Sequence, residues 1–156
     1  MASDPVFVRH EEDVGEQLVD ASWPPPDYQY AVLELPATLR APRSARVWAT
    51  AAAVTGSLND AERDDVMLVI SELVTNAVRH STYGPGEDTV SVALGVATPR
   101  LRIEVCDRGT GFAVEHVDRP IPDAPEGRGL FIVDAIATRW GTSQRGRHCV
   151  WMEIER

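Results

Sequence analysis

One predicted helix carries a strip of polar side chains that can do chemistry. Glu72, Thr75, Asn76, Arg79 and His80 fall on one side of its helical wheel, and its apolar residues fall on a different arc. An ordinary solvated face is the alternative interpretation. Such a face is usually rich in Lys and Glu, whereas Thr and Asn are weaker helix formers in mid-helix. The composition therefore favours a functional strip.

The carboxylate and the amide of this strip suit a site for a metal ion and a phosphate group. Mg²⁺ prefers hard oxygen ligands and keeps several waters, so Asn76 can supply one neutral oxygen while phosphate oxygens supply others. Glu72 lies one helical turn away and can accept a proton from an attacking hydroxyl group or water. Asn76 is thus a candidate metal ligand, and Glu72 is a candidate general base.

A strand-like segment ends in an acid that is followed by two spaced glycines, in the run Asp107-Arg108-Gly109-Thr110-Gly111. The two glycines permit positive φ and a close approach of the backbone to a ligand. Asp107 can accept a hydrogen bond from an exocyclic amine such as that of adenine. An ordinary turn at the end of a strand is the alternative, because Asp and Gly are common turn residues.

A second glycine cluster, Gly127-Arg128-Gly129-Leu130, stands directly before another predicted helix. Free backbone N–H groups at the start of a helix bind phosphate, and Arg128 can add a charge-assisted contact. No Gly-Lys-Ser/Thr follows, and no GxGxxG follows a strand, so the pattern is neither a P-loop nor a dinucleotide-binding fingerprint. A flexible loop that leads into a helix is the alternative.

An α+β framework must position these segments. Five segments have the character of strands, two of them (90–96 and 101–105) with alternating apolar residues, and three others have apolar residues at helical spacing. The predicted strands lie near 30–35, 90–96, 101–105, 140–144 and 148–154, and the predicted helices near 40–54, 60–81 and 130–138. This order predicts a two-layer sandwich, in which helices pack on one face of a mixed, mostly antiparallel sheet.

Composition limits the number of domains and the kinds of partner. A chain of 156 residues fits one domain, over residues 27–156, after an acidic tail at residues 1–26 that ends in three prolines and is expected to be flexible. A net charge of -9 disfavours a nucleic-acid partner. No apolar run is long enough for a bilayer and no secretory signal is present, so a cytoplasmic protein is expected. Cys106 and Cys149 are expected to be buried, reduced thiols rather than zinc ligands.

Three motifs, taken in order, resemble those of the GHKL ATPase/kinase superfamily, which has the Bergerat or histidine-kinase-like ATPase fold. The segment 71–80 (SELVTNAVRH) is similar to its N box, 107–112 (DRGTGF) to its DxGxG box, and 127–130 (GRGL) to its second glycine box. The resemblance covers about residues 28–155. Its character is that of the bacterial anti-sigma-factor serine/threonine kinases.

The resemblance implies ATP and Mg²⁺ as cofactors and assigns roles to single residues. Glu72 matches the catalytic base, Asn76 the Mg²⁺ ligand and Asp107 the acid that reads adenine. The other expected contacts to the nucleotide are Arg79, His80, Gly109, Gly111, Gly127, Arg128, Gly129 and Leu130. The segment between the two glycine boxes matches the ATP lid, and it is short and contains three prolines.

Three functions are compatible with these features. In the first, the protein is a serine/threonine kinase that phosphorylates a small anti-sigma-factor antagonist and also binds a sigma factor. In the second, it is a non-catalytic ATP-dependent module that binds proteins, and in the third it is an interaction domain without a nucleotide. Glu72 favours the kinase, since a pure binder needs no base. The resemblance implies protein partners, with no nucleic acid or membrane, and relatives that are often homodimers.

Overall fold

The computed structural model describes residues 3–9, 29–79, 88–97, 99–107, 128–144 and 147–156. Within these ranges the chain forms strands and helices in an order close to the predicted one. The elements are β1 (Ser3–Arg9), β2 (Gln29–Pro36), α1 (Ala41–Ala51), the 3₁₀ turn η1 (Ala53–Ser57), α2 (Asp60–Arg79), β3 (Thr89–Ala97), β4 (Arg100–Asp107), α3 (Arg128–Ile136), β5 (Arg139–Gln144) and β6 (His148–Glu155).

The six strands form one sheet in the order β1-β5-β6-β4-β3-β2. Every pair of neighbouring strands is antiparallel, so the described sheet contains no parallel pair of the kind that a mixed sheet would have. The reason is the crossover through α3, which places β5 parallel to β4 but one position away. β6 then returns between them and is antiparallel to both.

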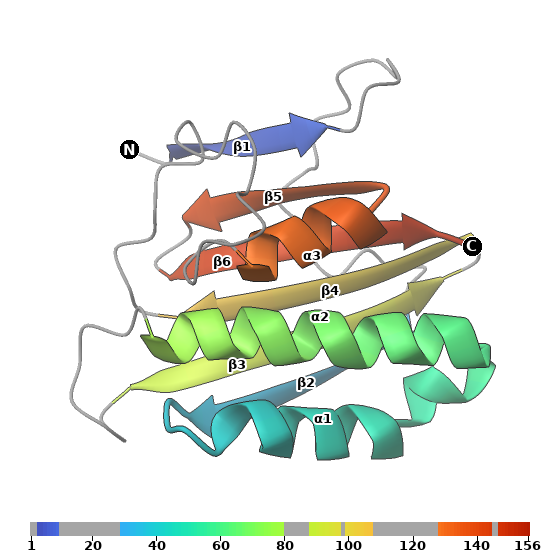
Figure 1. The fold of residues 1–156 in the computed structure, drawn as a ribbon, viewed down its shortest axis with the longest axis horizontal. Helices are drawn as coiled ribbons and strands as arrows, with labels where there is room; N and C mark the ends of the chain where they lie inside the picture. Colours follow the sequence, from blue (N-terminus) through green and yellow to red (C-terminus); the bar gives the residue numbers. More distant parts are fainter. Residues whose placement is uncertain (1–2, 10–28, 80–87, 98, 108–127, 145–146) are drawn as a thin grey trace.

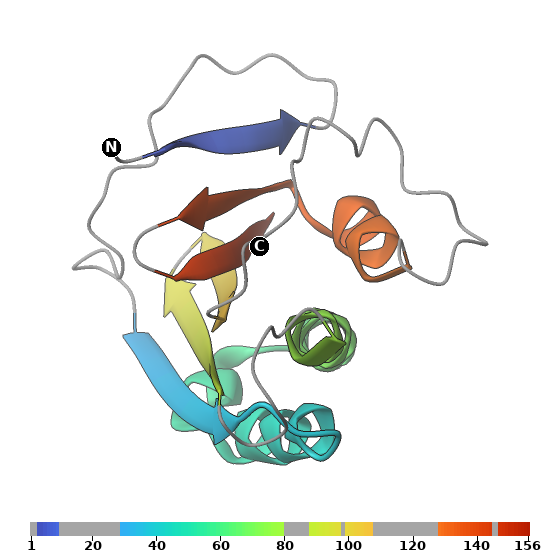
Figure 2. The ribbon, with the colours of Figure 1, turned by 90° about the vertical axis from the view of Figure 1, so that its left-hand side faces the viewer.

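The helices lie together on one face of the sheet, so the predicted two-layer α+β sandwich is confirmed. Figure 1 looks onto this face, and α2 lies between α1 and α3. Figure 2 shows the sheet from its side, with all three helices on the right of the strands. Helix α2 packs against both other helices and against β3 and β4. It is therefore the central element of the helical layer.

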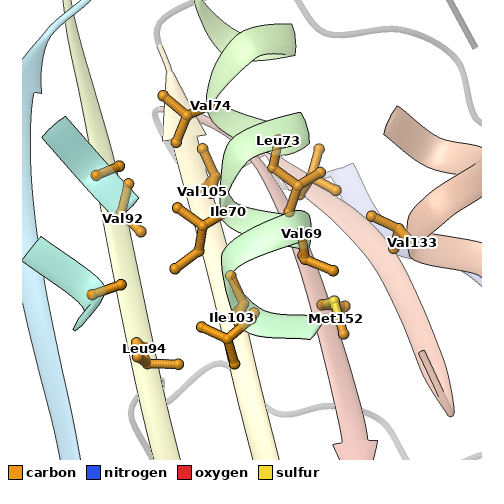
Figure 3. Packing of buried hydrophobic residues seen from close by; sticks show 14 of the residues in the cluster. Val69, Ile70, Leu73, Val74, Val92, Leu94, Ile103, Val105, Val133 and Met152 are labelled. Carbon is orange, nitrogen blue, oxygen red and sulfur yellow. The ribbon is translucent and has the colours of Figure 1, made fainter. Parts of the chain in front are cut away.

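The core lies between α2 and the middle strands. Val66, Val69, Ile70 and Leu73 recur along α2 at the spacing of one helical face, and each is at most 2% exposed. The side chains of β3 and β4 that face them, including Ile103, are also buried (Figure 3). Burial of one such side chain contributes about 1.5–3 kcal/mol, so this packing fixes where α2 lies on the sheet.

A reciprocal cap determines where α2 begins. The side chain of Asn59 accepts a hydrogen bond from the backbone N–H of Glu62, and the side chain of Glu62 accepts one from the N–H of Asn59, both at 2.9 Å. Asn59 is therefore the N-cap residue of α2. Arg156, the last residue of the chain, binds Glu62 at 2.9 Å and so ties the end of the sheet to this cap.

The N-terminal segment differs in part from the expectation of a flexible tail. Residues 3–9 form the edge strand β1, which pairs with β5 and shifts its register between Ser3 and Val6. Pro5 lies in that shift, which is consistent with a residue that cannot donate to a ladder. The apolar run Val6-Phe7-Val8 could have indicated a strand, although the acids that follow it favoured a tail. Residues 10–26 lie outside the described part of the chain.

The two cysteines are bonded to each other, so the expectation of reduced thiols is wrong for this structure. Cys106 of β4 and Cys149 of β6 are directly opposite in the strand register, and their Cα atoms are 4.0 Å apart. The sequence could not show this pairing, because β6 follows β4 only after the crossover through α3. The bond joins the two central strands near the end of β4.

The sheet face opposite the helices carries a buried network of charges. Arg102 is only 5% exposed, and its guanidinium group lies 3.0 Å from a carboxylate oxygen of both Glu104 and Glu153. Glu153 also binds Arg139, and Arg102 lies 4.6 Å from the ring centroid of Trp151. Opposite charges thus satisfy one another across three neighbouring strands.

Candidate functional site

The predicted polar strip of α2 lies at the border between the core and the surface. Glu72, Thr75 and Asn76 are half-buried, whereas Arg79, the last residue of the helix, is exposed. Asp64, in the first half of the same helix, is fully on the solvent side. The carboxylate of Glu72 and the amide of Asn76 are thus partly shielded from solvent.

Two hydrogen bonds that meet at Ser71 connect the strip with the rest of the helical layer. The hydroxyl of Thr75 donates to the carbonyl oxygen of Ser71 at 2.6 Å, a bond within one helical turn. The hydroxyl of Ser71 in turn accepts a hydrogen bond from Arg46 of α1 at 2.6 Å. These contacts explain how polar residues are accommodated in mid-helix, and they connect the strip with α1.

Asp107 is the last residue of β4, and it is buried. It is 5% exposed, and it pairs in register with His148, the first residue of β6, which is 6% exposed. The Nδ1 atom of His148 lies 3.8 Å from the Oδ2 atom of Asp107. A buried carboxylate at a strand end is costly unless it has polar neighbours, and His148 is one of them.

The elements that carry the predicted residues end on the same side of the molecule. Figure 1 shows the C-terminal ends of α2 and β4 and the beginning of α3 on its left-hand side. Figure 3 shows Val74 of α2 close to Val105 of β4, with both elements running in the same direction. Asn76 and Asp107 each follow two residues later. The packing of α2 on β4 and on α3 therefore brings Asn76, Asp107 and the first residues of α3 toward one end of the fold.

The second glycine box lies at the beginning of α3. The helix starts at Arg128, includes Gly129 as its second residue, and packs on α2. Leu130 is 6% exposed and belongs to the hydrophobic core, so its side chain anchors the helix. The other predicted contacts, His80, Gly109, Gly111 and Gly127, lie outside the described residues.

The sequence reasoning missed two features that adjoin Asp107. His148 was assigned only to a strand, and the partner of Cys106 was not foreseen. Both depend on the pairing of β4 with β6, which the order of elements along the chain does not reveal. A strand that begins with a polar residue before a buried apolar run was the only available signal for His148.

The comparisons with known proteins agree with this architecture. The family described as the histidine kinase-like ATPase domain matches residues 35–154. A serine-protein kinase RsbW from Oceanobacillus iheyensis is 25% identical over 120 residues, which cover 70% of this chain and 76% of that protein. An RsbW from Bacillus licheniformis is 33% identical over 85 residues, covering 47% of this chain and 52% of that protein.

A solved structure supports the fold independently of the family match. The crystal structure of the RsbU and RsbW domains of a Mycobacterium tuberculosis protein is similar with a TM-score of 0.57 and 21% identity. The similarity covers 82% of this chain and 33% of that one. The fold is that of an ATPase domain of the histidine kinase-like class. Because the family match spans most of the sequence, the chain belongs to the histidine kinase-like ATPase domain family.

No helix among the described residues is both long and apolar enough to cross a membrane.

Proposed function

We propose that this protein binds Mg-ATP where α2 and β4 end and α3 begins, and that it transfers the γ-phosphoryl group to a serine or threonine of a small antagonist protein. One observation carries the proposal. The half-buried Glu72 and Asn76 belong to the C-terminal half of α2, and α2 ends on the same side of the fold as β4, whose last residue is the buried Asp107. The family match and the RsbW relatives, which are named serine-protein kinases, support it.

Asp107 reads the base in this proposal. Its carboxylate accepts a hydrogen bond from the exocyclic amine of adenine, and Gly109 and Gly111 allow the backbone to pass beneath the base. The N–H groups at the start of α3, from Gly127 to Gly129, bind the phosphates, because they have no partner within the helix. Arg128 and, less centrally, Arg79 and His80 add positive charge, which an anionic ligand needs in a chain of net charge -9.

Glu72 and Asn76 act at the triphosphate. Their hard oxygens fit Mg²⁺, with Asn76 as the ligand, and the ion would neutralise charge on the β- and γ-phosphates. Glu72 orients the acceptor hydroxyl group and takes its proton. The acceptor oxygen forms a bond to the γ-phosphorus, the bond from that phosphorus to the bridging oxygen breaks, and ADP leaves with the electron pair.

The regulatory role follows from the resemblance to anti-sigma-factor kinases. In the nucleotide-bound form the protein binds and silences a sigma factor, and phosphorylation of the antagonist keeps the antagonist from competing. The protein partners, a homodimer and a cytoplasmic location belong to the same proposal. The chain spans about half the length of several RsbW relatives that it matches, so the biology of those whole proteins enters only here.

The test of catalysis compares Glu72→Gln with Asp64→Asn, an exposed acid on the same helix that serves as the control. Transfer of label from γ-labelled ATP to a cognate antagonist should fall about 100-fold or more in Glu72→Gln, because a positioned base contributes roughly 10²–10⁴-fold. Nucleotide affinity should be unchanged in both variants. Full transfer by Glu72→Gln would remove the base from the proposal.

The alternative function is a non-catalytic, ATP-dependent module that binds proteins. Glu72 would then only organise the water shell of the metal. Wild-type protein that binds Mg-ATP and its sigma factor, but transfers no label to any cognate antagonist, would favour this alternative. Asn76→Ala separates both functions from a simple interaction domain, since only a nucleotide-binding protein should lose heat of binding with Mg-ATP in that variant.

A further inference from the structure

His148 is a buried polar residue beside Asp107, and the proposed chemistry gives it no role. His148 and Asp107 each have side chains that are 8% exposed, and their nearest ring nitrogen and carboxylate oxygen are 3.8 Å apart. This separation is longer than a direct hydrogen bond, so it fits a contact that shortens, or that one water bridges, when a ligand arrives. Neither side chain points to bulk solvent.

The strand pairing holds these two residues opposite each other. Asp107 pairs with His148, and the adjoining pair, Cys106 and Cys149, is covalently bonded. The next pair, Val105 and Val150, is buried. A slip of the register would break this bond and expose the apolar pair, so the imidazole cannot move away along the strand.

Arg147, the residue before His148, connects the start of β6 with the two strands that lie beyond β4 in the sheet. Arg147 donates to Glu34 of β2 at 3.0 Å and to the carbonyl oxygen of Thr89 in β3 at 2.6 Å. Both contacts cross the end of β4. These contacts fix Arg147 and hence the start of β6. His148, the next residue, lies there beside Asp107.

We propose that His148 is a positioning residue, which orients the carboxylate of Asp107 toward the exocyclic amine of a purine and so makes the site specific for adenine. This inference rests on the proposed nucleotide site. A carboxylate can rotate about its last bond, and a rotated carboxylate presents its oxygens poorly to a planar base. An imidazole N–H directed at Oδ2 restricts that rotation, and the other oxygen of the oriented carboxylate accepts the hydrogen bond from the amine. A guanine would instead present a carbonyl oxygen to the carboxylate, and that arrangement is repulsive.

The experiment measures dissociation constants for ADP, for GDP and for a purine riboside diphosphate that lacks the exocyclic amine. The proteins are the wild type, His148→Leu, which replaces the imidazole with an apolar side chain of similar bulk, and His148→Asn, whose amide N–H lies near the place of Nδ1. Thermal melting of each protein reports whether it is folded. Wild-type protein should prefer ADP to both other nucleotides.

The expected result is selective. His148→Leu should weaken ADP binding about tenfold, the effect of losing an orienting hydrogen bond to a charged group, while the amine-free analogue should bind as before. His148→Asn should recover most of the ADP affinity and the preference over GDP. A purely structural role would instead weaken ADP and the analogue by the same factor in folded His148→Leu.

Two results with His148→Leu would overturn the inference and leave the proposed function intact. One is an equal loss for both ligands, and the other is an unchanged ADP affinity in His148→Leu with the preference over GDP retained. If His148→Leu does not fold, the same comparison is made with His148→Asn and His148→Gln. Gln places its N–H near Nε2 rather than Nδ1, so equal ADP affinity in these two variants would contradict a role for Nδ1. Absence of any ADP binding by the wild type would instead refute the nucleotide site itself.

Discussion

Reduction of the bond between Cys106 and Cys149 is a perturbation whose size can be worked from the chain. The two residues are separated by 43 positions, so the bond closes a loop of that length in the unfolded chain. The loss of loop-closure entropy for such a loop corresponds to about 4 kcal/mol at 25 °C. A domain of this size shifts its Tm by about 2–4 °C per kcal/mol, so reduction should lower the Tm by roughly 10 °C.

The assay is urea unfolding of the oxidised chain, of the chain kept in a dithiol reductant, and of the double variant Cys106→Ala, Cys149→Ala. Intact mass and thiol counting establish the redox state of each sample. The double variant should unfold near the reduced wild type and should not respond to the reductant. The slope of the transition should rise on reduction, because the released loop exposes more surface in the unfolded state.

Two outcomes would refute this reasoning at different points. If the thiols remain free under air oxidation of the folded protein, the pairing itself is wrong. If the bond forms but the oxidised and reduced proteins unfold at the same urea concentration, then the constraint on the unfolded chain does not stabilise the fold, and strain in the folded state offsets it.

Three further perturbations test other parts of the structure. A hydrogen bond from Arg156 lowers the pKa of Glu62 from its ordinary 4.5, against burial, which raises it. The ion pair therefore stabilises the fold at pH values above the ordinary pKa, and this stabilisation is lost as the pH falls through the lowered pKa of Glu62. Arg156→Gln should reduce the free energy of unfolding in urea by up to about 1 kcal/mol at neutral pH and by less in acid. Glu153→Leu should cost about 3 kcal/mol, because it removes a carboxylate from the buried Arg102; an equal Tm for variant and wild type would contradict this. Ile70→Ala should cost about 2–5 kcal/mol in the same measurement, and a smaller loss would mean that the core collapses around the cavity.

Local patterns predicted the elements well where one physical rule dominates. The periodic apolar residues of α2 predicted its buried face, which the structure packs against the sheet. The short polar–apolar alternation of β4 likewise predicted that Asp107 would stand at a strand end. These features depend on residues only a few positions apart, so the sequence contains the information needed.

Long-range pairing was beyond the reach of the same rules. Cys106 and Asp107 acquire their partners, Cys149 and His148, because β6 inserts between β4 and β5. Nothing in the spacing of these residues distinguishes that order from one in which β5 adjoins β4. The strand β1 was missed for a related reason, since an edge strand gains its stability from the sheet to which it is added.

The order of strands has a consequence for a chain that has been cut. A break anywhere between Asp107 and Arg128 divides the sequence into two pieces, one ending with β4 and the other containing α3, β5 and β6. The two pieces remain covalently linked by the disulfide, because one piece contains the cysteine of β4 and the other contains the cysteine of β6. A nicked molecule would consequently migrate as a full-length band until a reductant is added, and two separately produced halves could be rejoined by oxidation into one working unit.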